Sequence, residues 1–134
     1  MTAQPAAARL EHANITVLDP DASARMLVDL FGWRVRWSGE AINGGYTVHV
    51  GTGEQYLALY TGPERGKDQR KADDSYLRRG GLNHIGVIVP DLDAARARVV
   101  ALGFEPGELH DYEPGRRFYF REDNGIEIEV VAYD

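Results

Sequence analysis

Two stretches of the sequence, HANITVLD at residues 12–19 and HIGVIVPD at residues 84–91, decide the fold. They align without a gap, and each begins with a histidine and ends with an aspartate. The similarity continues downstream, where LFGW at residues 30–33 falls on ALGF at residues 101–104. Such self-similarity predicts a chain built from two copies of one half-module.

Each copy is predicted to form a strand, a helix and three further strands. Over residues 12–17, apolar and polar residues alternate as in a strand with one buried face. Asp19 is suited to cap a helix that ends before Gly32, and Asp91 and Gly103 bracket the second helix in the same way. Further strands are predicted at about residues 34–38, 46–50 and 55–61, and at about 105–110, 117–121 and 126–132.

The length of 134 residues predicts one domain covering residues 1–134, with half-modules at about residues 8–62 and 82–134. Residues 63–81 between them are mostly charged and lack apolar periodicity, which predicts a solvated linker or a mobile lid. The net charge of -6 argues against a nucleic-acid partner. No stretch approaches the roughly 20 apolar residues of a membrane span, and the N-terminus lacks the features of a signal peptide. A cytoplasmic location without a membrane partner is therefore expected.

Three strand side chains carry the predicted chemistry. His12 and His84 occupy the same position in the two copies, on the face away from the helices. Alternation on the last strand places Glu127 and Glu129 together, opposite its apolar residues. Because the chain has no cysteine, a metal site must use ligands of this kind, and two imidazoles with one carboxylate leave positions on a divalent ion free for substrate. The alternative is structural: hydrogen-bonded histidines and an edge strand with two solvated glutamates.

On these residues the sequence resembles the vicinal oxygen chelate superfamily, which includes glyoxalase I, fosfomycin-resistance proteins, extradiol ring-cleaving dioxygenases, methylmalonyl-CoA epimerase and bleomycin-binding proteins. The resemblance runs from LEHANITVLDPDAS through GLNHIGVIVPDLDAARARVVALGF to FYFREDNGIEIEVV. It implies an α+β fold of two βαβββ half-modules whose curled mixed sheets enclose a metal cleft. It also implies that His12, His84 and Glu129 are the metal ligands, whereas Glu127 matches a position that does not normally ligate.

The reaction that this resemblance favours is extradiol-dioxygenase-like, or another reaction of a two-histidine, one-carboxylate site on vicinal oxygens of a small substrate. The implied cofactor is a divalent metal ion, with Fe²⁺ or Mn²⁺ favoured and Zn²⁺ or Ni²⁺ as alternatives. His110 and Tyr119 stand 19 and 10 residues before Glu129, where such dioxygenases place a histidine and a tyrosine that handle protons. These two are the expected catalytic residues. The alternative is that Tyr119 is an ordinary strand residue and that His110 lies in a loop.

Two other functions stay open. A glyoxalase-like lyase or isomerase would carry a further glutamate where this chain has Leu57 or Ala58, with Gln55 nearby as a displaced amide ligand. A metal-free small-molecule binding protein, similar to the bleomycin-sequestering members, would need only a cleft for an aromatic ligand. The fosfomycin-type site loses support because Asn14 stands where those members have a threonine.

The resemblance also implies a homodimer, whose cleft closes either within one chain or across the interface. In the second form, His12 of one subunit meets His84 and Glu129 of the other. The repeat alignment places His49 on Arg121, and alternation places both on the cleft side of their strands. For His49 itself, however, we expect a position exposed on the surface.

Overall fold

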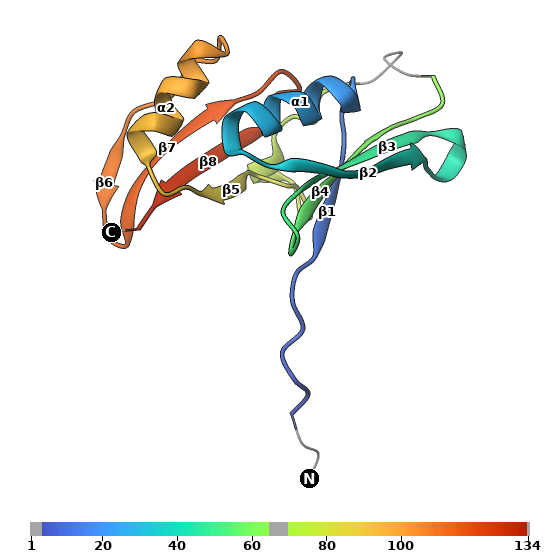
Figure 1. Cartoon of the computed structure of the whole chain (residues 1–134), viewed down its shortest axis with the longest axis horizontal. Helices are drawn as coiled ribbons and strands as arrows, with labels where there is room; N and C mark the ends of the chain where they lie inside the picture. The colour runs from blue at the N-terminus through green and yellow to red at the C-terminus, as the bar shows by residue number, and fades with distance from the viewer. Residues whose placement is uncertain (1–3, 65–69, 134) are drawn as a thin grey trace.

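The structure, a computed structural model, describes residues 4–64 and 70–133. It contains the predicted succession of strand, helix and three strands twice (Figure 1). The chain ends at 1–3 and 134, and residues 65–69 of the predicted linker, lie outside the described residues. The first half-module comprises β1 (His12–Thr16), α1 (Pro20–Phe31), β2 (Arg34–Glu40), β3 (Tyr46–Gly51) and β4 (Tyr56–Thr61), and the second comprises β5 (Ile85–Ile88), α2 (Leu92–Ala101), β6 (His110–Tyr112), β7 (Gly115–Arg121) and β8 (Glu127–Ala132).

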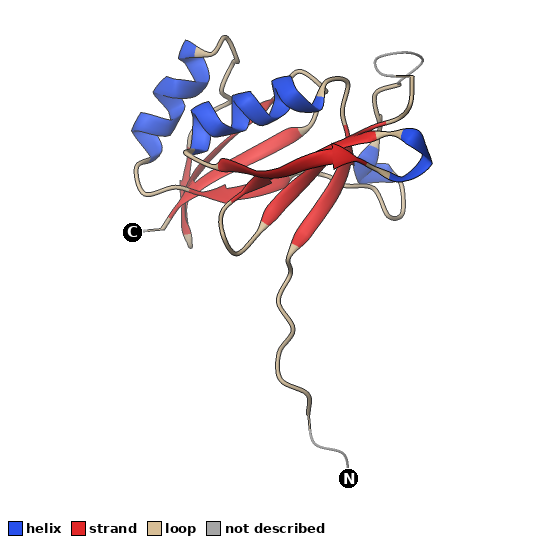
Figure 2. Cartoon of the chain, turned by 45° about the vertical axis from the view of Figure 1, so that its right-hand side comes forward, coloured by secondary structure: helices blue, strands red, loops and turns tan. Residues whose placement is uncertain are grey.

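The two sheets have the same strand order. The first sheet is ordered β1-β4-β3-β2 and the second β5-β8-β7-β6. In each sheet the first strand pairs in parallel with the last, and the other pairings are antiparallel. The two α-helices, α1 and α2, lie on the same side of the strands (Figure 2). The α+β fold of two mixed half-modules is confirmed.

Both helices begin where the sequence predicts. The Asp19 carboxylate accepts a hydrogen bond from the backbone N–H of Ala22, and Asp91 does the same for Ala94. Gly32 follows α1 with a φ of 68°, a left-handed conformation that glycine adopts at little cost. The helix boundaries are thus set by local chemistry.

One predicted strand is wrong over most of its length. The sequence predicted a strand at residues 105–110, whereas β6 begins only at His110 and runs to Tyr112. Pro106 has no backbone N–H to donate, and the N–H of Gly107 makes a single bond of 2.7 Å to the carbonyl of Tyr119. The ladder with β7 therefore starts later, and His110 lies in a strand and not in a loop, which was the alternative.

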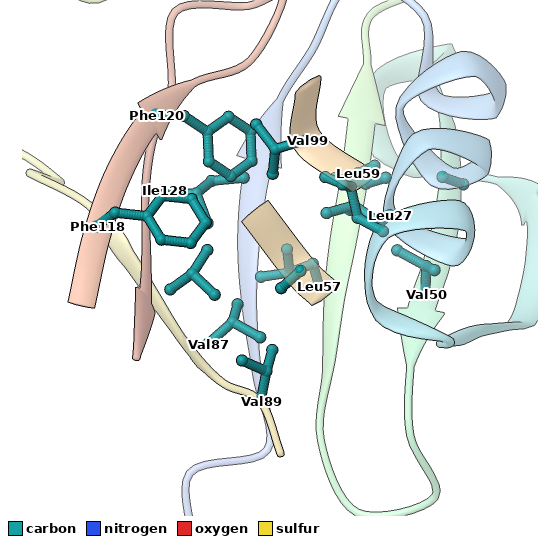
Figure 3. Packing of buried hydrophobic residues seen from close by; sticks show 14 of the residues in the cluster. Leu27, Val50, Leu57, Leu59, Val87, Val89, Val99, Phe118, Phe120 and Ile128 are labelled. Carbon is teal, nitrogen blue, oxygen red and sulfur yellow. The ribbon is translucent and has the colours of Figure 1, made fainter. Parts of the chain in front are cut away.

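A buried hydrophobic cluster takes residues from both half-modules (Figure 3). Leu27, Leu57 and Leu59 of the first half and Phe118 and Ile128 of the second are less than a tenth exposed. Burial of such side chains is worth about 1.5–3 kcal/mol each. The helix side of each sheet therefore carries most of the hydrophobic packing.

Polar contacts also join the halves. Nε of Arg98 on α2 donates to the carbonyl oxygen of Leu30 on α1 at 3.0 Å. The side chain of Asn124, in the β7–β8 turn, accepts from the N–H of Leu18 and donates to Oγ of Ser23. None of the helices within the described residues is long and apolar enough to cross a membrane.

Candidate metal centre

Strand register brings the predicted carboxylate and histidine onto one side of the second sheet. Gly86 of β5 pairs with Glu129 of β8, and Glu129 pairs with Tyr119 of β7. His84 precedes Gly86 by two residues, so alternation places it on the same side as Glu129. We call the sides of both sheets that face away from the helices the cleft face. On the second sheet the cleft face consists of His84, Glu127, Glu129, Arg117, Tyr119, Arg121 and His110.

His84 and Glu129 are in direct contact. Nε2 of His84 lies 3.4 Å from Oε2 of Glu129. The same carboxylate accepts a hydrogen bond of 2.7 Å from the Tyr119 hydroxyl and one of 3.3 Å from Nη1 of Arg117. The Glu129 side chain is only 13% exposed, and β8 lies between β5 and β7. The alternative of a solvated glutamate on an edge strand is therefore wrong for Glu129.

Tyr119 acts on this carboxylate as a hydrogen-bond donor. The hydrogen bond to Glu129, together with burial, raises the pKa of Tyr119 to about 12. A hydroxyl with this pKa keeps its proton at neutral pH and fixes the orientation of the carboxylate. His110 lies on the adjacent strand, with its ring centroid 6.2 Å from that of Tyr119. Both expected catalytic residues are thus on the cleft face.

Alkaline titration should identify Tyr119 as a late-ionising tyrosine. We expect the near-ultraviolet phenolate absorbance of the folded protein to include a step near pH 12, and this step should be missing in Tyr119→Phe. Because the pKa in the folded state lies above the ordinary 10.0, only the unfolded chain loses this proton between pH 10 and 12. The contribution of Tyr119 to stability is therefore complete below pH 10 and falls as the pH rises towards 12. A late step that persists in Tyr119→Phe would contradict the assignment.

Glu127 is held from two sides. The hydroxyl of Tyr76, which lies between the half-modules, donates to Oε1 of Glu127 at 2.9 Å, and Nη2 of Arg121 lies 3.4 Å from Oε2. The bond to Glu127 raises the pKa of Tyr76. The same hydroxyl lies 3.3 Å from Nδ1 of His84. Tyr76, in the described part of the predicted linker, therefore reaches the site. Most of the residues around it in the sequence are exposed.

On the first sheet, His12 belongs to a row of rings on the cleft face. Its ring stacks on Tyr56 with a centroid distance of 4.9 Å, and Tyr56 stacks on His49 at 4.6 Å. Trp37 follows at 5.2 Å from His49, so the row crosses β1, β4, β3 and β2. The Arg36 guanidinium lies 4.4 Å from the centroid of Tyr56. We call these four rings the aromatic row.

His49 is half-buried and not a surface residue. Burial, followed by the charges of His12 and Arg36, lowers the pKa of His49. Its imidazole is therefore neutral at neutral pH and contributes to the aromatic row as a flat ring. The register also corrects the repeat alignment. His49 pairs with Ala58, the counterpart of Glu129, and Tyr119 pairs with Glu129 itself, so His49 is the counterpart of Tyr119.

A glyoxalase-like site would have a further glutamate ligand on the last strand of the first half-module. The strand register shows which residue stands at that position in this chain. Asn14 pairs with Ala58 as Gly86 pairs with Glu129, so Ala58 is the equivalent of the glutamate. Leu57 belongs to the hydrophobic cluster on the opposite side of the sheet. Gln55 is exposed in the turn before β4. A methyl group therefore stands where a fourth carboxylate ligand would be.

The structure brings together two of the three predicted ligands. His84 and Glu129 are adjacent, whereas His12 lies in the aromatic row of the other sheet. Within residues 4–64 and 70–133 of one chain, no group of three or more histidine, cysteine or acidic side chains is placed to hold a metal ion. The adjacent pair itself fits an ion, since two donors bound at about 2.0–2.2 Å are at most about 4.4 Å apart.

Sequence reasoning missed three residues around the histidines. Arg117 shares its alternation with Tyr119, so the strand pattern could have placed it on the cleft face. Glu11, whose Oε1 lies 2.9 Å from Nδ1 of His12, directly precedes that histidine in the sequence, and this adjacency was the available signal. Tyr76 has no such signal, because the segment around it shows neither strand nor helix periodicity.

A groove of about 460 Å³ opens beside Glu127. Its walls come from β1, from the segment between the half-modules and from the β7–β8 turn. Arg78 lines this groove together with Arg121 and Asn14. Cationic side chains are therefore available to a substrate with an anionic group.

Residues 9–130 match the model of the Glyoxalase/Bleomycin resistance protein/Dioxygenase superfamily. Among solved structures, a glyoxylase/bleomycin resistance protein/dioxygenase domain from Frankia sp. EAN1pec is similar over 96% of this chain and 100% of its own, with 21% identity and a TM-score of 0.77. The fosfomycin resistance protein FosX from Mesorhizobium loti is 23% identical over 92% of this chain and 90% of its own, with a TM-score of 0.68. FosX from Listeria monocytogenes, complexed with Mn(II) and sulfate, is 17% identical over 96% and 95%, with a TM-score of 0.71. No curated protein matches the sequence.

Proposed function

Because the chain belongs to the glyoxalase/bleomycin resistance protein/dioxygenase superfamily, we propose that it is a divalent-metal-dependent enzyme acting on a small substrate with two neighbouring oxygen atoms. The proposal rests on the 3.4 Å separation between Nε2 of His84 and Oε2 of Glu129. When both atoms are deprotonated, their lone pairs repel each other at this distance. A bound cation would turn that contact into an attractive one.

The third ligand, in this proposal, is His12 of the partner subunit in a homodimer. His12 lies on the cleft face of the first sheet, away from His84 and Glu129 of its own chain. A second copy that places its first sheet over the second sheet of this chain would supply the missing imidazole. Two such sites would then form by symmetry, since an isologous contact repeats itself.

When bound, the metal ion would act as a Lewis acid that polarises the two substrate oxygens. Tyr119 and Arg117 hold the Glu129 carboxylate in place. His110, on the same face, would accept a proton from the substrate in this proposal. The groove beside Glu127 leads substrate to this face. A catechol fits these roles, because it offers two vicinal oxygens and a proton to be accepted, and an extradiol-dioxygenase-like reaction is our leading assignment.

Metal loading followed by a substrate screen tests this proposal. Metal-free protein is reconstituted anaerobically with Fe²⁺ or Mn²⁺, and bound metal is measured by elemental analysis. We expect stoichiometric metal, and oxygen consumption with a catechol in which one O₂ enters each cleaved ring. 2-Oxoaldehydes with a thiol and acyl-CoA esters test the lyase and isomerase alternatives. Protein that binds none of the four ions Fe²⁺, Mn²⁺, Zn²⁺ and Ni²⁺ would contradict the enzyme assignment.

The aromatic row supports a second candidate, a metal-free binding protein for flat aromatic molecules. Trp37 is 51% exposed, so one side of its indole is available for stacking. Under this alternative, protein treated with a chelator would still bind a planar aromatic ligand and show quenched Trp37 fluorescence. Trp37→Leu would then lose the ligand, whereas His84→Ala would keep it.

A further inference from the structure

Each of the two histidines has a hydrogen-bonded glutamate and tyrosine beside its Nδ1 atom. On the first sheet, Nδ1 of His12 lies 2.9 Å from Oε1 of Glu11. The hydroxyl of Tyr56 donates to the same oxygen at 3.4 Å. A carboxylate can only accept, so the proton of this imidazole resides on Nδ1.

On the second sheet the tyrosine stands between the histidine and the glutamate. The hydroxyl of Tyr76 donates its single hydrogen to Oε1 of Glu127 at 2.9 Å. Because this hydrogen is already used, the hydroxyl oxygen, 3.3 Å from Nδ1 of His84, is left as an acceptor for an imidazole N–H. The direct distance from Nδ1 of His84 to Oε1 of Glu127 is 3.8 Å, too long for a hydrogen bond. Tyr76 therefore relays the contact.

Protonation at Nδ1 leaves the lone pair of each neutral imidazole on Nε2. For His84, Nε2 is the atom that faces Glu129. Carboxylates bound to the outer nitrogen of a ligating histidine fix the ring and make it a stronger ligand. We propose that Glu11 with Tyr56, and Glu127 with Tyr76, are positioning pairs that set His12 and His84 as Nε2 ligands of the metal ion. This inference rests on the proposed function.

The two positioning pairs do not arise from the sequence duplication. Tyr56 stands opposite His12 in the register of its sheet, and the equivalent position opposite His84 is Glu127. Glu11 directly precedes His12 in the sequence, whereas Tyr76 belongs to the segment between the half-modules. Different residues thus place a glutamate and a tyrosine beside Nδ1 of both histidines, in different order, as expected if the pairs serve a common role.

Metal affinity in truncation variants tests the inference. Glu127→Ala and Glu11→Ala are titrated with Mn²⁺ or Zn²⁺ by calorimetry, and Tyr76→Phe removes only the relaying hydroxyl. We expect each glutamate variant to lose about 10–100-fold in affinity. Glu54→Ala is the matched control, because it removes the same charge from an exposed turn and should bind within about twofold of the wild type at moderate salt. Glutamate variants that bind like this control would overturn the inference.

The tautomer of each histidine gives a readout that does not depend on metal. Long-range ¹H–¹⁵N spectra of metal-free protein at about pH 8, above the ordinary pKa of histidine, should show protonated Nδ1 in His12 and His84. In Tyr76→Phe, His84 should lose this preference while His12 keeps it. Protonation at Nε2 in the wild type would overturn the inference. If the wild type binds no ion, the proposed function fails, and these spectra still decide whether the pairs fix the imidazoles.

Discussion

Mixed dimers of His12→Ala and His84→Ala chains should bind about one metal ion per dimer, whereas either variant alone should bind almost none. If the site is shared between subunits, one cleft of the mixed dimer combines the intact His84 and Glu129 of one chain with the intact His12 of the other. The second cleft collects both substitutions. Differently tagged chains are coexpressed, the mixed dimer is isolated by tandem affinity purification, and its metal is counted.

The matched control reverses the expected result. A chain carrying both His12→Ala and His84→Ala is paired with the wild type. A shared site then has one missing histidine in each cleft, so this dimer should bind almost no metal. A site within one chain would behave in the opposite way, with an intact cleft in the wild-type half here and none in the dimer of single variants. That opposite pattern would contradict the shared site.

The repeat in the sequence accounts for most of the fold. Because residues 12–19 and 84–91 share their periodicity and their capping aspartates, the order of strands and helices could be predicted from one copy and checked against the other. The strand at 105–110 failed because local chemistry at Pro106 and Gly107 opposes it, and the first copy has no counterpart of these residues. Duplication therefore predicts architecture well and local departures poorly.

The candidate site was predicted less completely, because it depends on strand register and on chain contacts that alignment does not contain. Loops of different length in the two copies shift the equivalent residues. His49 therefore corresponds to Tyr119 and not to Arg121. Alternation still placed His84 and Glu129 on one face, because it is read within each strand and does not depend on aligning the two copies. Tyr76 was missed because its role depends on where an aperiodic segment returns to the sheet.

The structure also changes what the Glu129→Ala variant is expected to do. Strand alternation, which places Glu129 and His84 on the side away from the helices, would by itself predict that both alanine variants lose metal with little loss of stability. However, Arg117 is only 11% exposed, and its Nη1 lies 3.3 Å from the Glu129 carboxylate. Nε and Nη2 of Arg117 are buried without a hydrogen-bond partner among the described residues. Removing the carboxylate would leave a guanidinium with little else to compensate its charge.

We therefore expect Glu129→Ala to lower the free energy of unfolding by roughly 3 kcal/mol, the cost of an uncompensated buried charge. For a chain of this length, that corresponds to a melting temperature lower by on the order of 10 °C, measured by circular dichroism. His84→Ala should stay within about 1 kcal/mol of the wild type, because its half-exposed ring leaves no buried charge behind.

The double variant Arg117→Met, Glu129→Ala separates charge from packing. It removes the guanidinium together with its carboxylate, so it should recover most of the stability that Glu129→Ala loses. A Glu129→Ala protein as stable as His84→Ala would contradict this account and would mean that Arg117 reaches solvent when released. If the loss is found, metal binding must be compared in Glu129→Gln, which keeps one oxygen that can accept from either Tyr119 or Arg117 while removing the charge that a metal ion requires.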